Sequence, residues 1–296
     1  MADLEFHDDP AAFLAAAGGH LAEEPVVSTV VATVAEQARA DDRAGVEPTV
    51  PYRWWVIARD DTGAVIGAGM RTAPFTPYPL FLLPMPHDAA ISLARHLHAR
   101  NEPVTGVNGA LPAARTCAEQ LARLTGGDVV VAQHTRLHRL DTLVPPRPVP
   151  GRLRPARPED VGLALAWFEA FARDADEQAG RPAGSMHDVA ETEASMLRRI
   201  KAGRLWFWTD EGADPVHLTG VNEPAFGAAR IGPVYTPKEH RGRGYAGATV
   251  AALSQRVLDE GAVPCLFTDQ ANPASNALYA ALGYRPVVDM VNLLVR

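Results

Sequence analysis

The sequence predicts an α/β (α+β) protein made of two similar halves. Its 296 residues exceed one average domain and suit two of about 145 residues each. The expected strands and helices follow a similar order on either side of a proline-rich stretch. A local echo supports duplication, since Arg53-Trp54-Trp55-Val56 in the first half resembles Arg204-Leu205-Trp206-Phe207 in the second.

The proline-rich stretch is Leu143–Gly151, which has four prolines in nine residues. Proline removes a backbone donor and fixes φ, so this stretch is predicted to be an extended, semi-rigid linker. The expected domains are therefore residues 1–142 and 152–296, joined by residues 143–151.

In the first half, apolar periodicity and turn residues predict helices and strands in mixed order. The expected helices are 10–17, 26–39, 87–98 and 111–124, and the expected strands are 54–59, 64–70, 80–83 and 128–138.

The second half is predicted to begin with a short strand and a helix that has apolar residues at Val161, Leu165, Phe168 and Ala172. The expected strands are 153–156, 205–209, 216–221, 228–235, 265–268 and 286–295, and the further helices are 189–200, a helix opening near residue 245 and 272–282.

Composition is that of a water-soluble globular protein, with 47% hydrophobic and 21% charged residues. A net charge of −7 argues against a nucleic-acid or anionic-membrane surface. The acidic start of the chain is unlike a signal peptide, and no apolar run reaches membrane-spanning length. Cys117 and Cys265 lie in different halves, so we expect no disulfide and a cytoplasmic location, with Cys265 buried in a strand.

The ten histidines form no spacing typical of a metal site. His134 and His138 lie in an alternating segment, which predicts that both are on one exposed strand face. We therefore expect no metal.

The most informative segment is Val234–Ala246, where an apolar strand runs through a charged turn into an amphipathic helix. That helix has Ala246, Val250, Leu253 and Val257 on one face. Glycines at a helix start permit close backbone approach, and the free N–H groups there favour an anion. The segment therefore predicts a site for a phosphate-bearing cofactor.

Two other phosphate motifs compete for this segment. A P-loop needs Gly-Lys-Ser/Thr, which is missing. Gly242-x-Gly244-x-x-Gly247 fits a dinucleotide fingerprint, and Asp269 lies 22 residues after Gly247, near the expected ribose-binding acid. Two observations disfavour the dinucleotide alternative. Polar residues separate the strand from the glycines, and only 27 residues follow Asp269, whereas a dinucleotide-binding fold needs several more strand–helix units. A glycine-rich turn without a ligand is the remaining alternative.

With the later segment Asn272–Tyr284, the loop resembles the acyl-CoA core of the GNAT N-acetyltransferase superfamily. Arg241, Gly244 and Ala246 occupy the defining places of its Gln/Arg-x-x-Gly-x-Gly/Ala pyrophosphate motif. The later segment matches its Asn…Tyr…Gly-Phe/Tyr pattern, and the two motifs together cover about 50 residues.

The resemblance implies two tandem domains, each a mostly antiparallel mixed sheet flanked by helices. It implies acetyl-CoA as co-substrate, with no metal, bound in the second domain. The residues implied in cofactor binding are Val234, Tyr235, Thr236, Arg241, Gly242, Arg243, Gly244, Tyr245, Ala246, Asn272, Ser275 and Asn276.

Acetyl transfer needs a donor for the oxyanion and a proton for the leaving thiolate. Gly232 and Pro233 interrupt regular strand pairing and predict a bulge that frees the N–H of Val234. The resemblance implies that this N–H faces the thioester carbonyl and that Tyr279 is the general acid. A bend without a ligand, and a capped surface helix carrying a tyrosine, are the plainer alternatives.

The general base stays open. Four carboxylates lie in regions that flank the acceptor cleft of the superfamily, and a water chain is equally compatible. They are Asp176, Glu177, Glu193 and Glu223.

In the first half, Met85-Pro86-His87-Asp88 stands where the second has the glycine-rich loop. We therefore expect a degenerate GNAT-like domain that holds no pyrophosphate. The predicted function is acetyl transfer from acetyl-CoA to an amine of a small molecule or peptide by direct attack. The alternatives are a non-catalytic acyl-CoA-binding or regulatory protein and a mycothiol-synthase-like transferase. We expect neither nucleic-acid nor membrane partners, and a monomer or homodimer.

Overall fold

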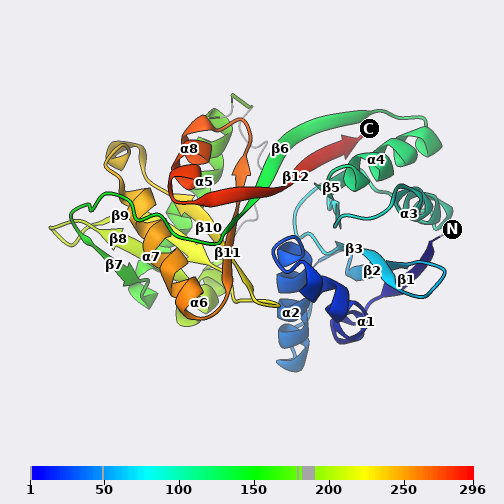
Figure 1. Cartoon of the computed structure of the whole chain (residues 1–296), viewed down its shortest axis with the longest axis horizontal. Helices are drawn as coiled ribbons and strands as arrows, with labels where there is room; N and C mark the ends of the chain where they lie inside the picture. Colours follow the sequence, from blue (N-terminus) through cyan, green and yellow to red (C-terminus); the bar gives the residue numbers. More distant parts are fainter. Residues whose placement is uncertain (1, 49, 179, 182–190) are drawn as a thin grey trace. The chain divides into compact units, whose positions relative to one another are not determined.

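The computed structural model describes residues 2–48, 50–178, 180–181 and 191–296. The chain divides into two compact units (Figure 1). The first unit consists of Met1–Leu137 and Val287–Arg296, and the second of His138–Pro286. The predicted α/β class is confirmed, because both units combine helices with a mixed sheet.

The first unit alternates helices with short strands. Its helices are α1 (Pro10–Glu23), α2 (Thr29–Arg43), α3 (His87–Ala99) and α4 (Ala113–Thr125). Its strands are β1 (Asp3–His7), β2 (Trp54–Arg59), β3 (Val65–Arg71), β4 (Leu80–Leu82), β5 (Gly106–Ala110), most of β6 (Val129–Leu140) and most of β12 (Tyr284–Val295).

The strand order in this unit is β1-β2-β3-β4-β5-β12-β6. The β4–β5 pair is parallel, whereas β1–β2, β2–β3, β3–β4 and β5–β12 are antiparallel. The faces of α3 and α4 that carry small and aliphatic side chains pack on this sheet, with Leu93, Leu97 and Leu121 in the core.

The second unit carries the predicted site. Its helices are α5 (Val161–Gln178), α6 (Glu193–Lys201), α7 (Tyr245–Asp259) and α8 (Pro273–Ala281), and its strands are β7 (Arg152–Pro155), β8 (Leu205–Thr209), β9 (Pro215–Val221), β10 (Ala228–Tyr235) and β11 (Val263–Asp269). Two short 3₁₀ turns, η1 (Pro158–Asp160) and η2 (Lys238–His240), precede α5 and α7.

The strand order here is β11-β10-β9-β8-β7. The β10–β11 pair is parallel and the others are antiparallel. Period-2 alternation sends neighbouring residues to opposite faces, which gives the sheet a core on each side. Ala229, Ile231 and Leu253 pack together on the α7 side, whereas Phe207 and Met196 belong to the core on the α5 and α6 side.

The compact units differ from the expected domain boundaries at the C-terminus. We expected the second domain to reach residue 296, but Val287–Arg296 joins the first unit. The cause is strand pairing, because Met290–Leu294 forms an antiparallel ladder with Gly106–Ala110. Neither β1 nor β5 was expected as a strand.

The expected linker also lies wholly within the second unit and packs on its helices. The amide of Val144 donates to the carbonyl of Leu282, at the end of α8, over 3.0 Å. Further along, Pro146 and Val149 approach the start of α7, across which this segment passes in Figure 1. We call residues 143–151 the proline segment below.

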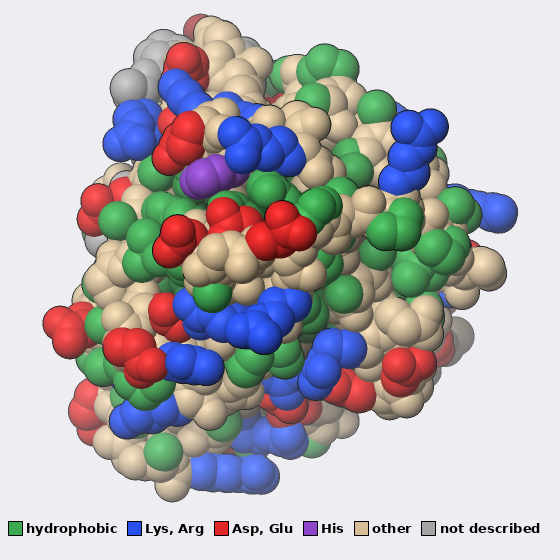
Figure 2. All heavy atoms as spheres, turned by 90° about the vertical axis from the view of Figure 1, so that its left-hand side faces the viewer, with side chains coloured by type: hydrophobic (Ala, Val, Ile, Leu, Met, Phe, Trp, Pro, Cys, Tyr) green, Lys and Arg blue, Asp and Glu red, His purple; other side chains and the backbone are tan. Residues whose placement is uncertain are grey.

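Surface charge in this part of the chain is mixed. Figure 2 shows a face on which Lys and Arg side chains are interspersed with Asp and Glu side chains and small hydrophobic areas.

The expectation that His134 and His138 are both exposed was wrong, since His134 is exposed but His138 is buried. Among the described residues, no helix combines the length and apolar character needed to span a bilayer.

Candidate functional site

Strand β10 leaves its parallel partner halfway along its length. It pairs with β11 at Ala228 to Arg230, opposite Val263 to Cys265, and that register does not extend to Ile231–Tyr235. The β9–β10 register shifts between Ile231 and Val234, as predicted for a bulge at Gly232-Pro233. We call this separation of residues 231–235 from residues 266–269 the β10/β11 divergence.

Strand β9 accommodates this bulge through a glycine. A Cβ on Gly220 of β9 would lie 2.6 Å from the carbonyl oxygen of Gly232, so a side chain there would clash with backbone. Glycine at this position allows the bulged strand to approach β9 closely. The bulge therefore keeps its pairing on one side while the other side separates from β11.

The first unit has no such divergence in its described residues. All three residues of β4 pair with β5, at Leu80–Val107, Phe81–Asn108 and Leu82–Gly109. Gly109 packs directly on the backbone of Leu82, so these strands are in close contact at the end of β4. Helix α3 then begins after Pro86, without a glycine-rich turn.

A glycine-rich turn leads from the divergence into α7. Gly242 and Gly244 have φ values of +75° and +85°, a left-handed conformation that favours glycine. Gly244 is the N-cap of α7 and provides no side-chain acceptor for the first turn. The N–H groups of that turn are therefore available to an anion, and the helix dipole favours its negative charge.

The proline segment borders this turn. Val149 Cγ1 lies 2.7 Å from where a Cβ of Gly244 would stand. A Cβ on Gly247, one turn into the helix, would lie 3.3 Å from Leu278 of α8 and 3.9 Å from Pro146. The proline segment thus forms one wall beside the start of α7.

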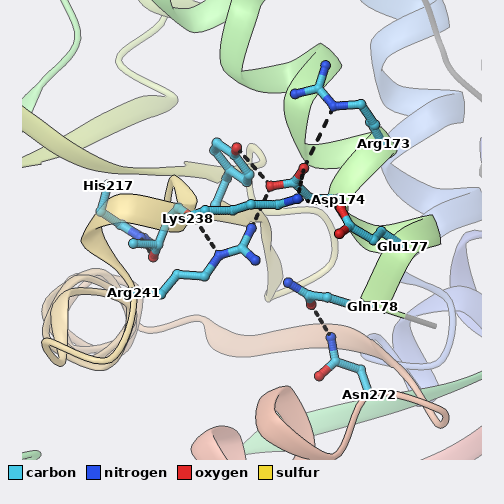
Figure 3. A network of polar contacts seen from close by, with 10 residues as sticks. Arg173, Asp174, Glu177, Gln178, His217, Lys238, Arg241 and Asn272 are labelled. Carbon is cyan, nitrogen blue, oxygen red and sulfur yellow. Dashed lines mark hydrogen bonds and ion pairs between the residues drawn. The ribbon is translucent and has the colours of Figure 1, made fainter. Parts of the chain in front are cut away.

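Arg241, which the resemblance implies in cofactor binding, is paired within the protein. Its Nη2 lies 2.6 Å from Asp174 Oδ2, and its Nε donates to the Thr236 carbonyl over 3.0 Å (Figure 3). Asp174 is on α5 and is only 3% exposed. Because this carboxylate neutralises the guanidinium, Arg241 fixes the loop against α5 and contributes little net charge.

Asp174 collects further partners at the same point. The Tyr235 hydroxyl donates to Asp174 Oδ2 over 3.1 Å. The pKa of Tyr235 is raised, mainly by burial and then by the negative charge of this carboxylate. Lys238 Nζ lies 3.8 Å from Oδ1 and also pairs with Glu177. The loop is thus tied to α5 through one buried carboxylate, and most of its cationic charge is compensated.

Arg243 differs from its neighbours. Its Nη2 donates to the Glu239 carbonyl over 3.2 Å, and its side chain is exposed. No carboxylate among the described residues lies within ion-pair distance of Arg243. Arg243 is therefore the loop arginine whose charge is most available to a phosphate.

Thr236 is held by a buried histidine. Its Oγ1 lies 2.7 Å from Nδ1 of His217, whose Nε2 lies 2.7 Å from Thr219 Oγ1. Burial lowers the pKa of His217 to about 3. The imidazole therefore stays neutral at physiological pH and orders the end of β10 through hydrogen bonds instead of acting as a base.

The start of α8 is capped as predicted. Asn272 Oδ1 accepts from the Ser275 amide over 3.1 Å, and its Nδ2 donates to Gln178 of α5 over 2.9 Å (Figure 3). Asn276 Nδ2 donates to the carbonyls of Asp269 and Asn272. These bonds fix α8 to the end of β11, on the far side of the divergence from β10.

Tyr279 is 6% exposed and packs in the core beneath α7. Its ring meets the ring of Tyr284 edge to face, with centroids 5.9 Å apart. Burial raises the pKa of Tyr279 well above its usual value of 10. The phenol therefore keeps its proton throughout the physiological range, as a general acid must.

The four carboxylates considered for the general base have separate surroundings. Glu177 pairs with Lys238, and Glu223 with Arg204. Asp176 is buried and lies 3.2 Å from Arg181, which also pairs with Asp269. Glu193 lies in the first turn of α6. None of these contacts identifies a base.

Sequence reasoning missed Asp174 and His217. The apolar pattern of α5 was followed only to Ala172, whereas the helix continues to Gln178 and places Asp174 against the loop. The neighbouring sequence does not reveal that Asp174 is buried, because its partner Arg241 lies far along the chain. His217 lies in an apolar strand, where alternation could have suggested burial.

Comparisons with known proteins agree with this geometry. Residues 221–292 match the family model described as FR47-like protein. This match contains the β10 bulge, the glycine-rich turn and α8. No curated protein matches the chain.

Many solved structures match the chain, and three of them are compared with it below. A tandem GNAT protein from the clavulanic acid biosynthesis pathway matches with 16% identity and a TM-score of 0.52, over 99% of this chain and 98% of that one. A GCN5-related N-acetyltransferase from Sphaerobacter thermophilus matches with 18% identity and a TM-score of 0.55, over 88% and 84%. A Drosophila protein matches with 14% identity and a TM-score of 0.61, over 99% of both chains.

At these identities the matched structures show a shared fold, and the expected resemblance is confirmed at that level. The chain therefore has the fold of the GNAT N-acetyltransferase superfamily, and its second unit contains the segment that matches the FR47-like family model.

Proposed function

We propose that the second unit transfers an acetyl group from acetyl-CoA to an amine of a small molecule or peptide. The observation that carries this proposal is the β10/β11 divergence beside the uncapped start of α7. Together they offer a stretch of strand that is not paired with β11, for an extended thioester arm, and a set of backbone donors for its diphosphate. The first unit lacks both features in its described residues.

The residues present fit the cofactor. Gly242, Arg243, Gly244, Tyr245 and Ala246 would hold the diphosphate, mainly through backbone N–H groups. Val234, Tyr235 and Thr236 would present backbone to the pantetheine arm, with the N–H of Val234 directed at the thioester carbonyl. Arg241 would act indirectly by holding the loop.

The amide groups at the start of α8 would define the other side of the arm. Asn272, Ser275 and Asn276 already share hydrogen bonds there, so their positions are fixed before a cofactor arrives. Side chains that are already ordered avoid a reorganisation cost during reaction.

The transfer itself needs no covalent enzyme intermediate. The lone pair of a neutral amine attacks the thioester carbon and forms a C–N bond, while the oxyanion is stabilised by the N–H of Val234. Collapse breaks the C–S bond, and the departing thiolate takes its proton from Tyr279. The amine proton leaves to solvent or to a base.

Thiol release in the presence of acetyl-CoA and a panel of primary amines tests the proposal directly. We expect at least one amine to accelerate release well above hydrolysis, with the N-acetyl product visible by mass spectrometry. Tight acetyl-CoA binding with no acetylated product from any amine would favour a non-catalytic acyl-CoA-binding protein instead.

The proposal predicts one acetyl-CoA per chain, because within the described ranges β10 diverges from its parallel neighbour and β4 does not. Isothermal titration calorimetry should give a stoichiometry close to one. A stoichiometry of two would contradict the assignment and point to a second cradle near Met85–Asp88.

Gly244→Ala should weaken acetyl-CoA binding at least about tenfold, because a methyl group would block close approach of the diphosphate. It would also force a left-handed residue, at about 1–2 kcal/mol, and contact Val149. Calorimetry on the folded variant measures the affinity.

Gly261→Ala is the matched control, since Gly261 follows the other end of α7 with φ +77° and open space around it. It should lower stability without changing acetyl-CoA affinity. Equal affinity losses in the two variants would mean that helix stability, and not phosphate approach, sets binding.

Tyr279→Phe should lower kcat by roughly 10²–10⁴ with little change in acetyl-CoA affinity, since it removes a positioned acid and keeps the ring. Because burial raises the pKa of Tyr279, the wild-type enzyme should lose no activity from this group as pH rises to 10. Steady-state kinetics from pH 6 to 10 measures both effects.

Tyr284→Phe provides the comparison, because Tyr284 is buried beside Tyr279 and its hydroxyl lies 2.7 Å from Ser254 Oγ. It should cost stability and leave kcat within a few-fold of wild type. Normal turnover by Tyr279→Phe would remove the acid from the mechanism.

A further inference from the structure

Arg230 occupies the last position at which β10 still pairs with β11. Its partner in the register is Cys265, and the strands separate immediately afterwards. Its neighbours Ala229 and Ile231 pack in the core beneath α7. By strand alternation, the Arg230 side chain is therefore on the opposite face, which α5 and α6 cover.

Among the residues that the structure describes, no carboxylate pairs with this side chain, and its Nη1 is buried and makes no hydrogen bond. The groups that act on it electrostatically are Arg199 of α6 and the Cys265 thiol, and burial lowers the pKa of Arg230. An unpaired cation thus lies at the base of the β10/β11 divergence.

Other half-buried arginines of the second unit are paired. Each of the following has a carboxylate within ion-pair distance: Arg154 with Asp160, Arg181 with Asp176 and Asp269, Arg199 with Glu191, and Arg241 with Asp174. Arg199 is therefore already neutralised where it faces Arg230. The exception is the arginine closest in sequence to the bulge.

An unpaired buried charge is costly, and such groups are normally paired or bound to a ligand of opposite sign. A guanidinium presents a planar fork that matches a carboxylate with two parallel hydrogen bonds. One free positive charge calls for one negative charge. The missing partner is therefore best supplied by a monoanionic group that arrives with a substrate.

We propose that Arg230 binds a carboxylate of the acceptor, so that the acceptor amine is an amino acid or a peptide with a nearby carboxylate. This inference rests on the proposed function, because it places the acceptor on the α5 and α6 face of β10. Phe168 packs on the same side of the sheet, with its ring 5.4 Å from the Arg199 guanidinium, and contributes apolar surface there. Arg230 would act as a specificity determinant for the amine.

The test compares acceptors that differ only in the carboxylate. Amino acids of increasing chain length, from glycine to 6-aminohexanoate, are paired with their methyl esters. For at least one length, the wild-type kcat/KM should favour the free acid by about 10- to 100-fold, the usual strength of a hydrogen bond to a charged group. Arg230→Met should remove that preference and leave the ester rate within a few-fold.

Arg256→Met is the control, since Arg256 lies over the Trp206 ring on the α7 side and is exposed. It should keep the preference for the free acid. Equal rates with acids and esters in the wild type, or an unchanged preference in Arg230→Met, would overturn the inference while acetyl transfer itself stands.

Thermal unfolding gives a readout that does not need turnover. Removing an unpaired buried cation should leave the Tm of Arg230→Met equal to or above that of the wild type. The preferred amino acid should raise the Tm of the wild type and not of the variant. A large fall in Tm on substitution would show that Arg230 is structural, whereas absent turnover together with the predicted Tm pattern would contradict only the acetyl-transfer proposal.

Discussion

The separation of β10 from β11 after Arg230 is the constraint on which the rest of the second unit depends. A parallel pair that stayed closed, as β4 and β5 do, would satisfy its own backbone and leave no edge for a ligand. The bulge at Gly232-Pro233 shifts the register with β9, and Gly220 gives the close approach that this shift requires. The end of β10, the glycine-rich turn and the start of α7 then present backbone N–H donors one after another.

Electrostatics in this unit follow from one buried carboxylate. Asp174 joins α5 to Tyr235, Lys238 and Arg241, so it couples the helix next to the expected acceptor to the loop expected to hold the cofactor. The loop appears basic in sequence, but two of its three cationic side chains near η2 are compensated within the protein. Anion binding would therefore rely on Arg243, on the backbone of the turn and on the dipole of α7, and the last two are fixed before binding.

Much of this arrangement could be predicted from the sequence because it is encoded locally. Glycines at a helix start, Gly-Pro within a strand, and Asn-Pro before a short helix each specify backbone geometry over a few residues. The bulge and the α8 cap were predicted for these reasons. The ends of α5 and β11 were predicted less accurately, because apolar periodicity weakens where polar residues face inward.

The features that escaped prediction depend on distant residues. Asp174 meets Arg241 across 67 positions, and the last ten residues join the first unit through pairing with β5. The proline segment was expected to be a linker because its composition forbids regular structure, and it is indeed irregular. Its packing beside Gly244 follows from the tertiary fold, which composition alone does not predict.

Hydrogen–deuterium exchange with and without acetyl-CoA tests the central claim most directly, because it reports backbone amides in both units at once. If the divergence and the start of α7 form the cofactor site, exchange should slow in residues 232–247 and stay unchanged in residues 80–90, the corresponding part of the first unit. Slower exchange in residues 80–90, or no change in residues 232–247 at saturating acetyl-CoA, would contradict the account.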